Sequence, residues 1–236
     1  MIGFTSGRYI SEKVFLDRLD LFVNMGCDAI ELHLKQQDLD YFNYPPSIYQ
    51  KLKVFKYVAL HTPALNVNFD ASDISRKMMD TVDIFLEKSQ AQSVVIHPDR
   101  ISIPEILAQR NWPLTLENMD WRKNDAKSIE QMDKWFEIFP QAKMVLDWNH
   151  IFTNDQSMKL GKLMLKKFGS KITHYHLSGF IDEDRLHEPI LTSNSFEIAK
   201  SVPKDGKPII IEVDTTNLDK IILKKEIEFL RKELAR

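Results

Sequence analysis

The sequence contains little of several features that mark particular protein classes. Cys27 is the only cysteine, which excludes an intrachain disulfide and with it a disulfide-stapled secreted scaffold. The chain has only seven glycines, and neither a G-x-G-x-x-G turn nor a phosphate-binding P-loop appears. No apolar run approaches the roughly 20 residues that a membrane-spanning helix needs. The expected class is therefore a globular protein that neither spans a membrane nor uses these glycine-rich nucleotide motifs.

The sequence also lacks a clear excess of positive or negative charge. The 32 Lys and Arg residues nearly balance the 34 Asp and Glu residues, and the net charge is -2. A protein that binds nucleic acid or anionic lipid through its overall charge would carry a clear basic excess. The first residues lack the basic-then-apolar pattern of a secretion signal. We therefore expect a cytoplasmic protein without a membrane partner.

Short apolar runs alternate with longer amphipathic stretches, and no low-complexity linker separates them. The helical stretches are typified by residues 129–139, where the apolar side chains recur at helical spacing. Ser72 and Ser128 stand where helix N-caps are expected, and Gly26 stands where a helix should end. The apolar runs predict eight strands: Ile2–Thr5, Ala29–His33, Tyr57–His61, Ser93–His97, Leu114–Glu117, Lys143–Asp147, Ile172–Leu177 and Pro208–Glu212.

This alternation predicts right-handed βαβ crossovers and a parallel sheet. Eight units in 236 residues average about 29 residues each, which suffices for a (β/α)8 TIM barrel. An open doubly wound sheet is the alternative, but it would be favoured by a glycine-rich phosphate turn after an early strand. We therefore expect an α/β fold with one TIM-barrel domain over residues 1–236.

Most of the predicted strands end in a residue type that can bind metal. In a TIM barrel the carboxyl ends of all eight strands meet at one mouth, where enzymes of this fold carry out their chemistry. A single carboxylate after a strand is usually a helix N-cap or a solvated loop residue, so the joint pattern carries the argument. The six candidates from strands three to eight are His61, His97, Glu117, Asp147, His176 and Glu212.

Several buried carboxylates are stable together only when cations compensate their charge. His150 follows Asp147 by three residues, and His187 lies in the loop after strand seven, near Asp184. Because histidine nitrogen is mixed with carboxylate oxygen, Zn²⁺, Mn²⁺ or Fe is favoured over Mg²⁺ or Ca²⁺. His33 is expected just beyond the mouth and His174 deeper, as a hydrogen-bonded interior residue.

The chain resembles the xylose-isomerase-like TIM-barrel superfamily, which includes endonuclease IV and many sugar isomerases and epimerases. The resemblance rests on these residues and extends over the whole chain, strand by strand. The segments that carry the resemblance are His61-Thr62-Pro63, His97-Pro98, Leu116-Glu117-Asn118, Leu146-Asp147 with His150, His176-Leu177, Asp184-Arg185 with His187, and Glu212. The resemblance implies one to three metal ions. Their ligands would be His61, His97 and Glu117 for the first, Glu117, Asp147, His176 and Glu212 for the second, and His150, Asp184 and His187 for the third.

The sequence departs from endonuclease IV where that enzyme faces DNA. Ala64 stands in place of a tyrosine that enters the duplex, and Met119-Asp120-Trp121 replaces a run of small residues. Two residues rather than one separate Asp184 from His187. The segment from Gly26 to Leu32, which includes Glu31, is more similar to the sugar isomerases. A small sugar-phosphate or nucleotide-like substrate is therefore favoured over duplex DNA.

Two mechanisms follow from this set of residues. The first is phosphate ester hydrolysis by two or three metals that activate water. His61 and His97 favour it, because a one-metal isomerase does not need them as ligands. Glu117 would then bridge two metals and position the nucleophile. The second is a sugar isomerase or epimerase, in which one metal polarises a carbonyl. In it Glu117 and Glu212 remove and return a proton, and His150 contacts the substrate.

Overall fold

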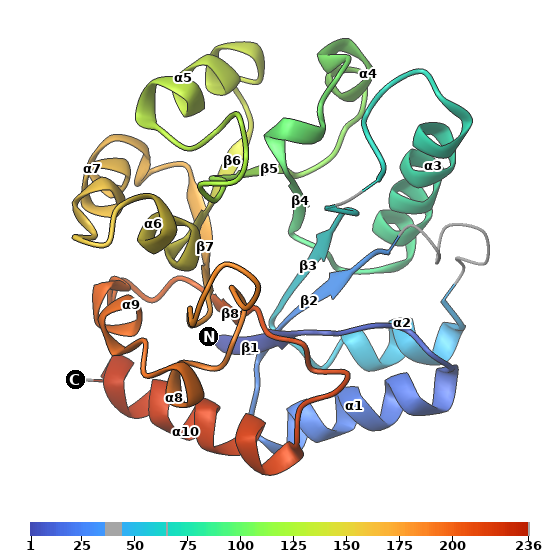
Figure 1. Ribbon diagram of the computed structural model, residues 1–236. Helices are drawn as coiled ribbons and strands as arrows, with labels where there is room; N and C mark the ends of the chain where they lie inside the picture. The colour runs from blue at the N-terminus through green and yellow to red at the C-terminus, as the bar shows by residue number, and fades with distance from the viewer. Residues whose placement is uncertain (36–43, 65, 236) are drawn as a thin grey trace.

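In the computed structural model, which describes residues 1–35, 44–64 and 66–235, eight parallel strands close into a barrel (Figure 1). Each strand pairs with its neighbour in the chain, and β1 also pairs with β8. This confirms the predicted (β/α)8 barrel. The strands are β1 Ile2–Thr5, β2 Ala29–His33, β3 Tyr57–His61, β4 Ser93–Ile96, β5 Leu114–Glu117, β6 Lys143–Asp147, β7 Ile172–Leu177 and β8 Ile209–Ile211.

The helices form a ring around the strands (Figure 1). Across the described residues, no helix is both long enough and apolar enough to cross a membrane. The helices are α1 Glu12–Asn24, α2 Pro46–Leu52, α3 Asp73–Lys88, α4 Pro104–Ala108, α5 Ile129–Ile138, α6 Trp148–Asn154, α7 Lys159–Phe168, α8 Ile190–Ser193, α9 Phe196–Ser201 and α10 Lys220–Ala235.

The predicted helix signals act as expected at several ends. Ser72 caps α3, and Ser128 caps α5 in a reciprocal capping box with Gln131. The α1 helix ends at Asn24, and Gly26 then takes a positive φ of 76°, which glycine adopts without strain. Helices α2, α6 and α8, which have four to seven residues each, are absent from the predictions.

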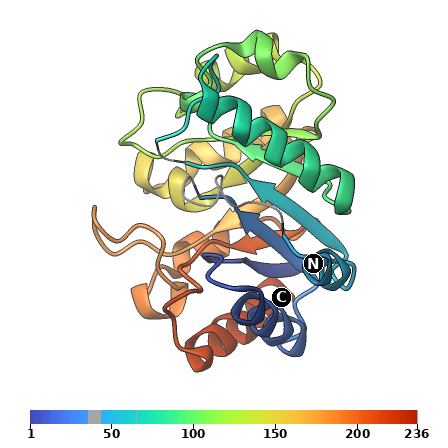
Figure 2. The ribbon, with the colours of Figure 1, turned by 90° about the vertical axis from the view of Figure 1, so that its right-hand side faces the viewer.

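Two predicted carboxyl ends of strands differ from the observed ones by one residue, and the last strand also begins one residue later than predicted. Strand β4 ends at Ile96 and β8 ends at Ile211, so His97 and Glu212 are the first residues after their strands. Their side chains still lie at the carboxyl end of the barrel. In Figure 2 the strands run away from the side that holds the N-terminus, and the loop after β7 projects beyond their far ends. All the strand-end candidates therefore face one mouth.

The barrel interior is polar at this end. Below the mouth it is filled by a small cluster of Ala29, Tyr57, Ala59 and Ile210. The larger apolar core lies outside the strands, where the buried faces of the helices pack. Because the interior positions nearer the mouth carry acids and histidines instead of apolar groups, their charges have to be satisfied by one another or by a bound cation.

Candidate metal centre

Four side chains from four consecutive strand ends meet at the mouth. One ligand atom each from Glu117, Asp147, His176 and Glu212 lies within 4.8 Å of the others. His176 Nδ1 is central, at 3.0 Å from Glu117 Oε1, 3.5 Å from Glu212 Oε2 and 3.8 Å from Asp147 Oδ2. The strand order alone produces this arrangement, since β5, β6, β7 and β8 are neighbours in the barrel. Residues almost a hundred positions apart thus converge on one point.

The donor set fits a divalent metal ion. Asp147 Oδ2 and Glu212 Oε2 are buried, and neither accepts a hydrogen bond. An oxygen that is removed from water and left without a donor costs on the order of 1–3 kcal/mol. Two such oxygens aimed at the same imidazole nitrogen are well placed to ligate a cation. Three carboxylates and one imidazole form a mixed oxygen and nitrogen shell of the kind that transition ions accept.

The carboxylates of this cluster differ in proton affinity. Burial raises the pKa of Asp147 to about 7. Burial also acts to raise the pKa of Glu117, but the charge of His176 and hydrogen bonds from histidines hold that pKa well below its usual value. For Glu212, His187 and His176 outweigh burial in the same way, so the pKa of Glu212 is also low. Histidines thus supply the positive charge that a bound metal would supply.

His61 and His97 contact the second oxygen of Glu117. The Nε2 atom of each lies 3.1 Å from Glu117 Oε2, and the three residues form a further group of closely spaced ligand atoms. His61 Nδ1 lies 2.7 Å from the carbonyl oxygen of Thr62, an acceptor, so the Nδ1 hydrogen is donated there. The structure therefore brings together the two ligand sets that share Glu117.

His150 and His187 lie next to the cluster. The His150 backbone amide donates to Asp147 Oδ1, and its Nδ1 lies 2.8 Å from the carbonyl oxygen of Asn118. Burial lowers the pKa of His150, but Asp147, Glu117 and Glu212 outweigh burial and raise it to about 9. His187 Nδ1 lies 3.6 Å from Glu212 Oε2, and the His187 and His150 rings are 5.6 Å apart.

Asp184 does not join these two histidines. It is exposed, and it lies in the Asp182–Arg185 turn, where its amide donates to the Asp182 side chain. We expect Asp184→Asn to leave the number of bound ions per chain unchanged, because its carboxylate belongs to no group of ligand atoms among the described residues. Metal analysis of the purified variant tests this. A loss of one ion per chain would show that Asp184 is a ligand.

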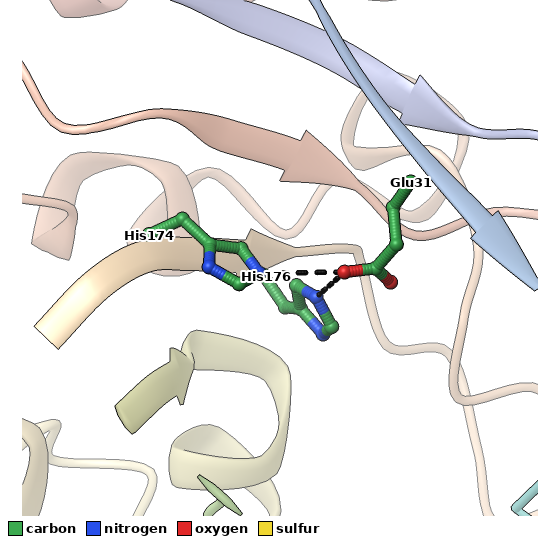
Figure 3. A group of neighbouring side chains, drawn as sticks. All are labelled: Glu31, His174 and His176. Atoms are coloured by element: carbon green, nitrogen blue, oxygen red, sulfur yellow. Dashed lines mark hydrogen bonds and ion pairs between the residues drawn. The ribbon is translucent and has the colours of Figure 1, made fainter. Parts of the chain in front are cut away.

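Sequence reasoning missed the part that Glu31 plays in this centre. Glu31 is fully buried on β2, and it faces three imidazoles at once. Its Oε1 lies 3.1 Å from His33 Nε2, and its Oε2 lies 3.0 Å from His176 and 3.3 Å from His174 (Figure 3). The usable signal was an acid inside an apolar strand, two residues before a histidine, since that spacing puts both on the same face.

A cavity of about 520 Å³ opens beside the cluster. His33, His187 and Glu212 line it, together with Thr5 and Thr216. His33 Nε2 lies 3.7 Å from Glu212 Oε1, so the cavity reaches the edge of the metal-type residues. Its volume lies within the range usual for small-molecule sites.

No family model and no curated protein matches the chain, but many solved structures do, and the three that follow align with nearly all of it. The 3-keto-D-glucoside 4-epimerase YcjR from E. coli aligns with a TM-score of 0.62 at 12% identity, over 98% of both chains. The D-psicose 3-epimerase from Clostridium cellulolyticum H10 aligns with a TM-score of 0.64 at 14% identity, over 99% of both. A sugar phosphate isomerase/epimerase from Parabacteroides distasonis aligns with a TM-score of 0.56 at 10% identity, over 100% of this chain and 95% of that one.

The chain therefore shares its TIM-barrel fold with these sugar epimerases, as the sequence predicted. The expectation of phosphate ester hydrolysis is wrong. The structures described above, which align with nearly the whole chain, are sugar epimerases and an isomerase/epimerase, and none of them is a phosphate ester hydrolase. The error came from His61 and His97. In the sequence these two histidines favour a multinuclear hydrolase, whereas in the structure each also contacts Glu117 directly, a role that does not require a second metal.

Proposed function

We propose that the protein is a metal-dependent epimerase of a small keto sugar. The observation that carries the proposal is the group formed by Glu117, Asp147, His176 and Glu212 at the mouth of the barrel. It combines a shell for one divalent ion with two glutamates from β5 and from the end of β8. An epimerase needs such a pair, because one group removes a proton from carbon and another returns it to the opposite face.

A divalent transition ion in this shell would polarise the carbonyl of a ketose and the neighbouring hydroxyl, which would acidify the C–H bond of the carbon that carries this hydroxyl. The protein itself has to hold the sugar and move the proton. We assign proton removal and return to Glu117 and Glu212. His150 lies 3.6 Å from Glu117 Oε1 and is assigned to substrate contact, while His33 and His187 line the cavity through which the sugar enters.

The structural neighbours support a sugar as the substrate. One of them is a D-psicose 3-epimerase solved with D-tagatose, another is a D-allulose 3-epimerase solved with D-allulose, and a third is an L-ribulose 3-epimerase. Among them an unphosphorylated ketose is the recurring substrate. We therefore propose a free ketose in place of the sugar-phosphate or nucleotide-like ester that the sequence favoured.

We propose that a single ion serves catalysis. His61 and His97 then act on Glu117, because each presents Nε2 to the oxygen that faces away from His176. Two imidazoles on this oxygen would leave Glu117 Oε1 aimed at the ion and at the substrate. Metal analysis of the active protein tests this assignment, with one tightly held ion per chain as the expected value. Two ions would assign His61 and His97 to a second site.

The activity is tested by incubating the metal-loaded protein with D-psicose, D-tagatose or L-ribulose in D₂O. We expect the ketose to be converted to its epimer, with one solvent deuteron incorporated at the carbon that is inverted. Proton NMR follows both events in the same sample. Formation of an aldose would identify an isomerase instead, and the absence of exchange on all ketoses would contradict the proposal.

A further inference from the structure

Glu31 occupies a position that the proposed reaction does not explain. It lies on β2, whereas the four cluster residues come from the ends of β5 to β8, and its side chain is completely buried. One of its carboxylate oxygens faces the imidazoles of both His174 and His176 (Figure 3). A charged group is retained in such a place only when it is fully hydrogen-bonded.

The two ring nitrogens of His176 have different surroundings. Nδ1 faces the cluster, at 3.0 Å from Glu117 Oε1, and Nε2 faces Glu31 Oε2, also at 3.0 Å. A carboxylate can only accept a hydrogen bond, so the contact with Glu31 places the ring hydrogen on Nε2. By the same rule Nδ1 carries a hydrogen toward Glu117 while no ion is bound, and a cation held by the acids would displace that hydrogen and take the Nδ1 lone pair. The hydrogen that remains on Nε2 for Glu31 gives the tautomer that an imidazole needs to ligate a metal through Nδ1.

Glu31 is itself held on several sides. His174 Nε2 lies 3.3 Å from Oε2, and on the other side of that ring Nδ1 lies 2.8 Å from the Tyr57 hydroxyl. The tyrosine can donate to Nδ1, which leaves the His174 hydrogen on Nε2 for Glu31. His33 Nε2 contacts the other oxygen, Oε1, at 3.1 Å. Contacts with His33 on β2 and with His174 on β7, which Tyr57 on β3 holds in turn, therefore fix the carboxylate independently of its contact with His176.

We propose that Glu31 is a positioning residue of the metal centre, which fixes the ring orientation and tautomer of His176 so that Nδ1 ligates the ion. The inference deepens the proposed function and rests on its metal shell. Partners of this kind behind a ligating histidine typically change metal affinity by about 10–100-fold. We expect the same range here, since Glu31 directly supports one of four ligands.

A second interpretation of the same residues gives a different result. One ligand atom each from Glu31, His174 and His176 lies within 4.8 Å of the others, so the three could hold an ion of their own. The contacts described above favour positioning, because the three groups already satisfy one another by hydrogen bonds. The number of bound ions separates the two interpretations.

The test compares metal-free wild type, Glu31→Gln and Glu226→Gln, each titrated with Co²⁺ in competition with a chelator. Glu226 is the matched control, because it is also a fully buried glutamate but lies on α10, where it accepts the backbone amides of Ile190 and Leu191. We expect Glu31→Gln to bind Co²⁺ about 10–100-fold more weakly, with an unchanged number of ions and an altered visible spectrum. Glu226→Gln should match wild type in affinity and spectrum.

Equal affinity and an unchanged spectrum in Glu31→Gln would overturn the proposal. So would the loss of one ion per chain with no effect on the remaining ion, since Glu31 would then be a ligand. A general loss of structure would weaken binding but would also lower the unfolding temperature, which is measured alongside. No sugar is present in these titrations, so the proposal survives if metal binding depends on Glu31 while ketoses are not epimerised.

A measurement on unmodified protein supports the variant. In wild type labelled with ¹⁵N-histidine, two-bond nitrogen–proton correlations report which ring nitrogen carries the hydrogen. We expect the His176 hydrogen on Nε2 in the Zn²⁺-loaded protein. A hydrogen on Nδ1 in that state would overturn the proposal, because Nε2 would then be the ligand and could not donate to Glu31.

Discussion

Replacing Glu212 with glutamine is expected to reduce epimerisation by about 10²–10⁴-fold, the usual contribution of a positioned acid or base. The amide keeps an oxygen that can ligate the ion, but it cannot accept a proton from carbon. Glu212 Oε2 is buried and accepts no hydrogen bond, so its lone pairs are available to receive a proton. The rate of epimer formation is measured at saturating metal, and metal content is checked in the same preparation.

The variant also separates the two halves of the reaction. If Glu117 serves one face of the sugar and Glu212 the other, Glu212→Gln should still exchange a proton for solvent deuterium on one epimer without inverting it. The control is Glu183→Gln, an exposed carboxylate in the loop after β7, which should behave as wild type. Unchanged epimerisation in Glu212→Gln would remove Glu212 from proton transfer, and loss of the ion would assign it to metal binding alone.

Much of the barrel could be predicted because most strands leave two signals in the sequence. An apolar run marks its body, and the residue after that run, such as Asp147 or Glu212, marks its carboxyl end. Since parallel strands in a closed barrel all end at the same mouth, the linear order of these residues was enough to predict that they converge. The observed group of Glu117, Asp147, His176 and Glu212 has this origin.

The features that the sequence did not reveal depend on distances across the barrel. Glu31 and His176 are 145 positions apart, and nothing in either local pattern indicates that β2 and β7 face each other through the interior. Asp184 shows the reverse case. Its place near His187 in the chain suggested a shared ligand role, but the turn over 182–185 directs it to the surface. The type of reaction was also ambiguous, because a histidine beside a glutamate, such as His61 or His97, can either ligate a metal or donate a hydrogen bond to the carboxylate.

Removing the metal is expected to destabilise the protein as well as inactivate it. Three carboxylates, those of Glu117, Asp147 and Glu212, converge on one point, and without a cation they rely on histidines and on protonation of Asp147. An ion that binds only the folded state stabilises it by about 4 kcal/mol at a thousand times its dissociation constant. For a domain of this size that corresponds to a shift in unfolding temperature on the order of 10 °C.

Thermal unfolding of chelator-treated protein, with and without added Mn²⁺ or Zn²⁺, measures this shift. Asp147→Asn is the informative variant. It keeps the shape of the side chain but removes a charge whose Oδ2 has no hydrogen-bond partner, so it should lose most of the metal-dependent stabilisation while the metal-free protein unfolds at the wild-type temperature or above. Asp184→Asn should retain the full shift, because its carboxylate is exposed. If metal raised the unfolding temperature of Asp147→Asn as much as that of wild type, the ion would bind elsewhere, and the assignment of Glu117, Asp147, His176 and Glu212 as its shell would be wrong.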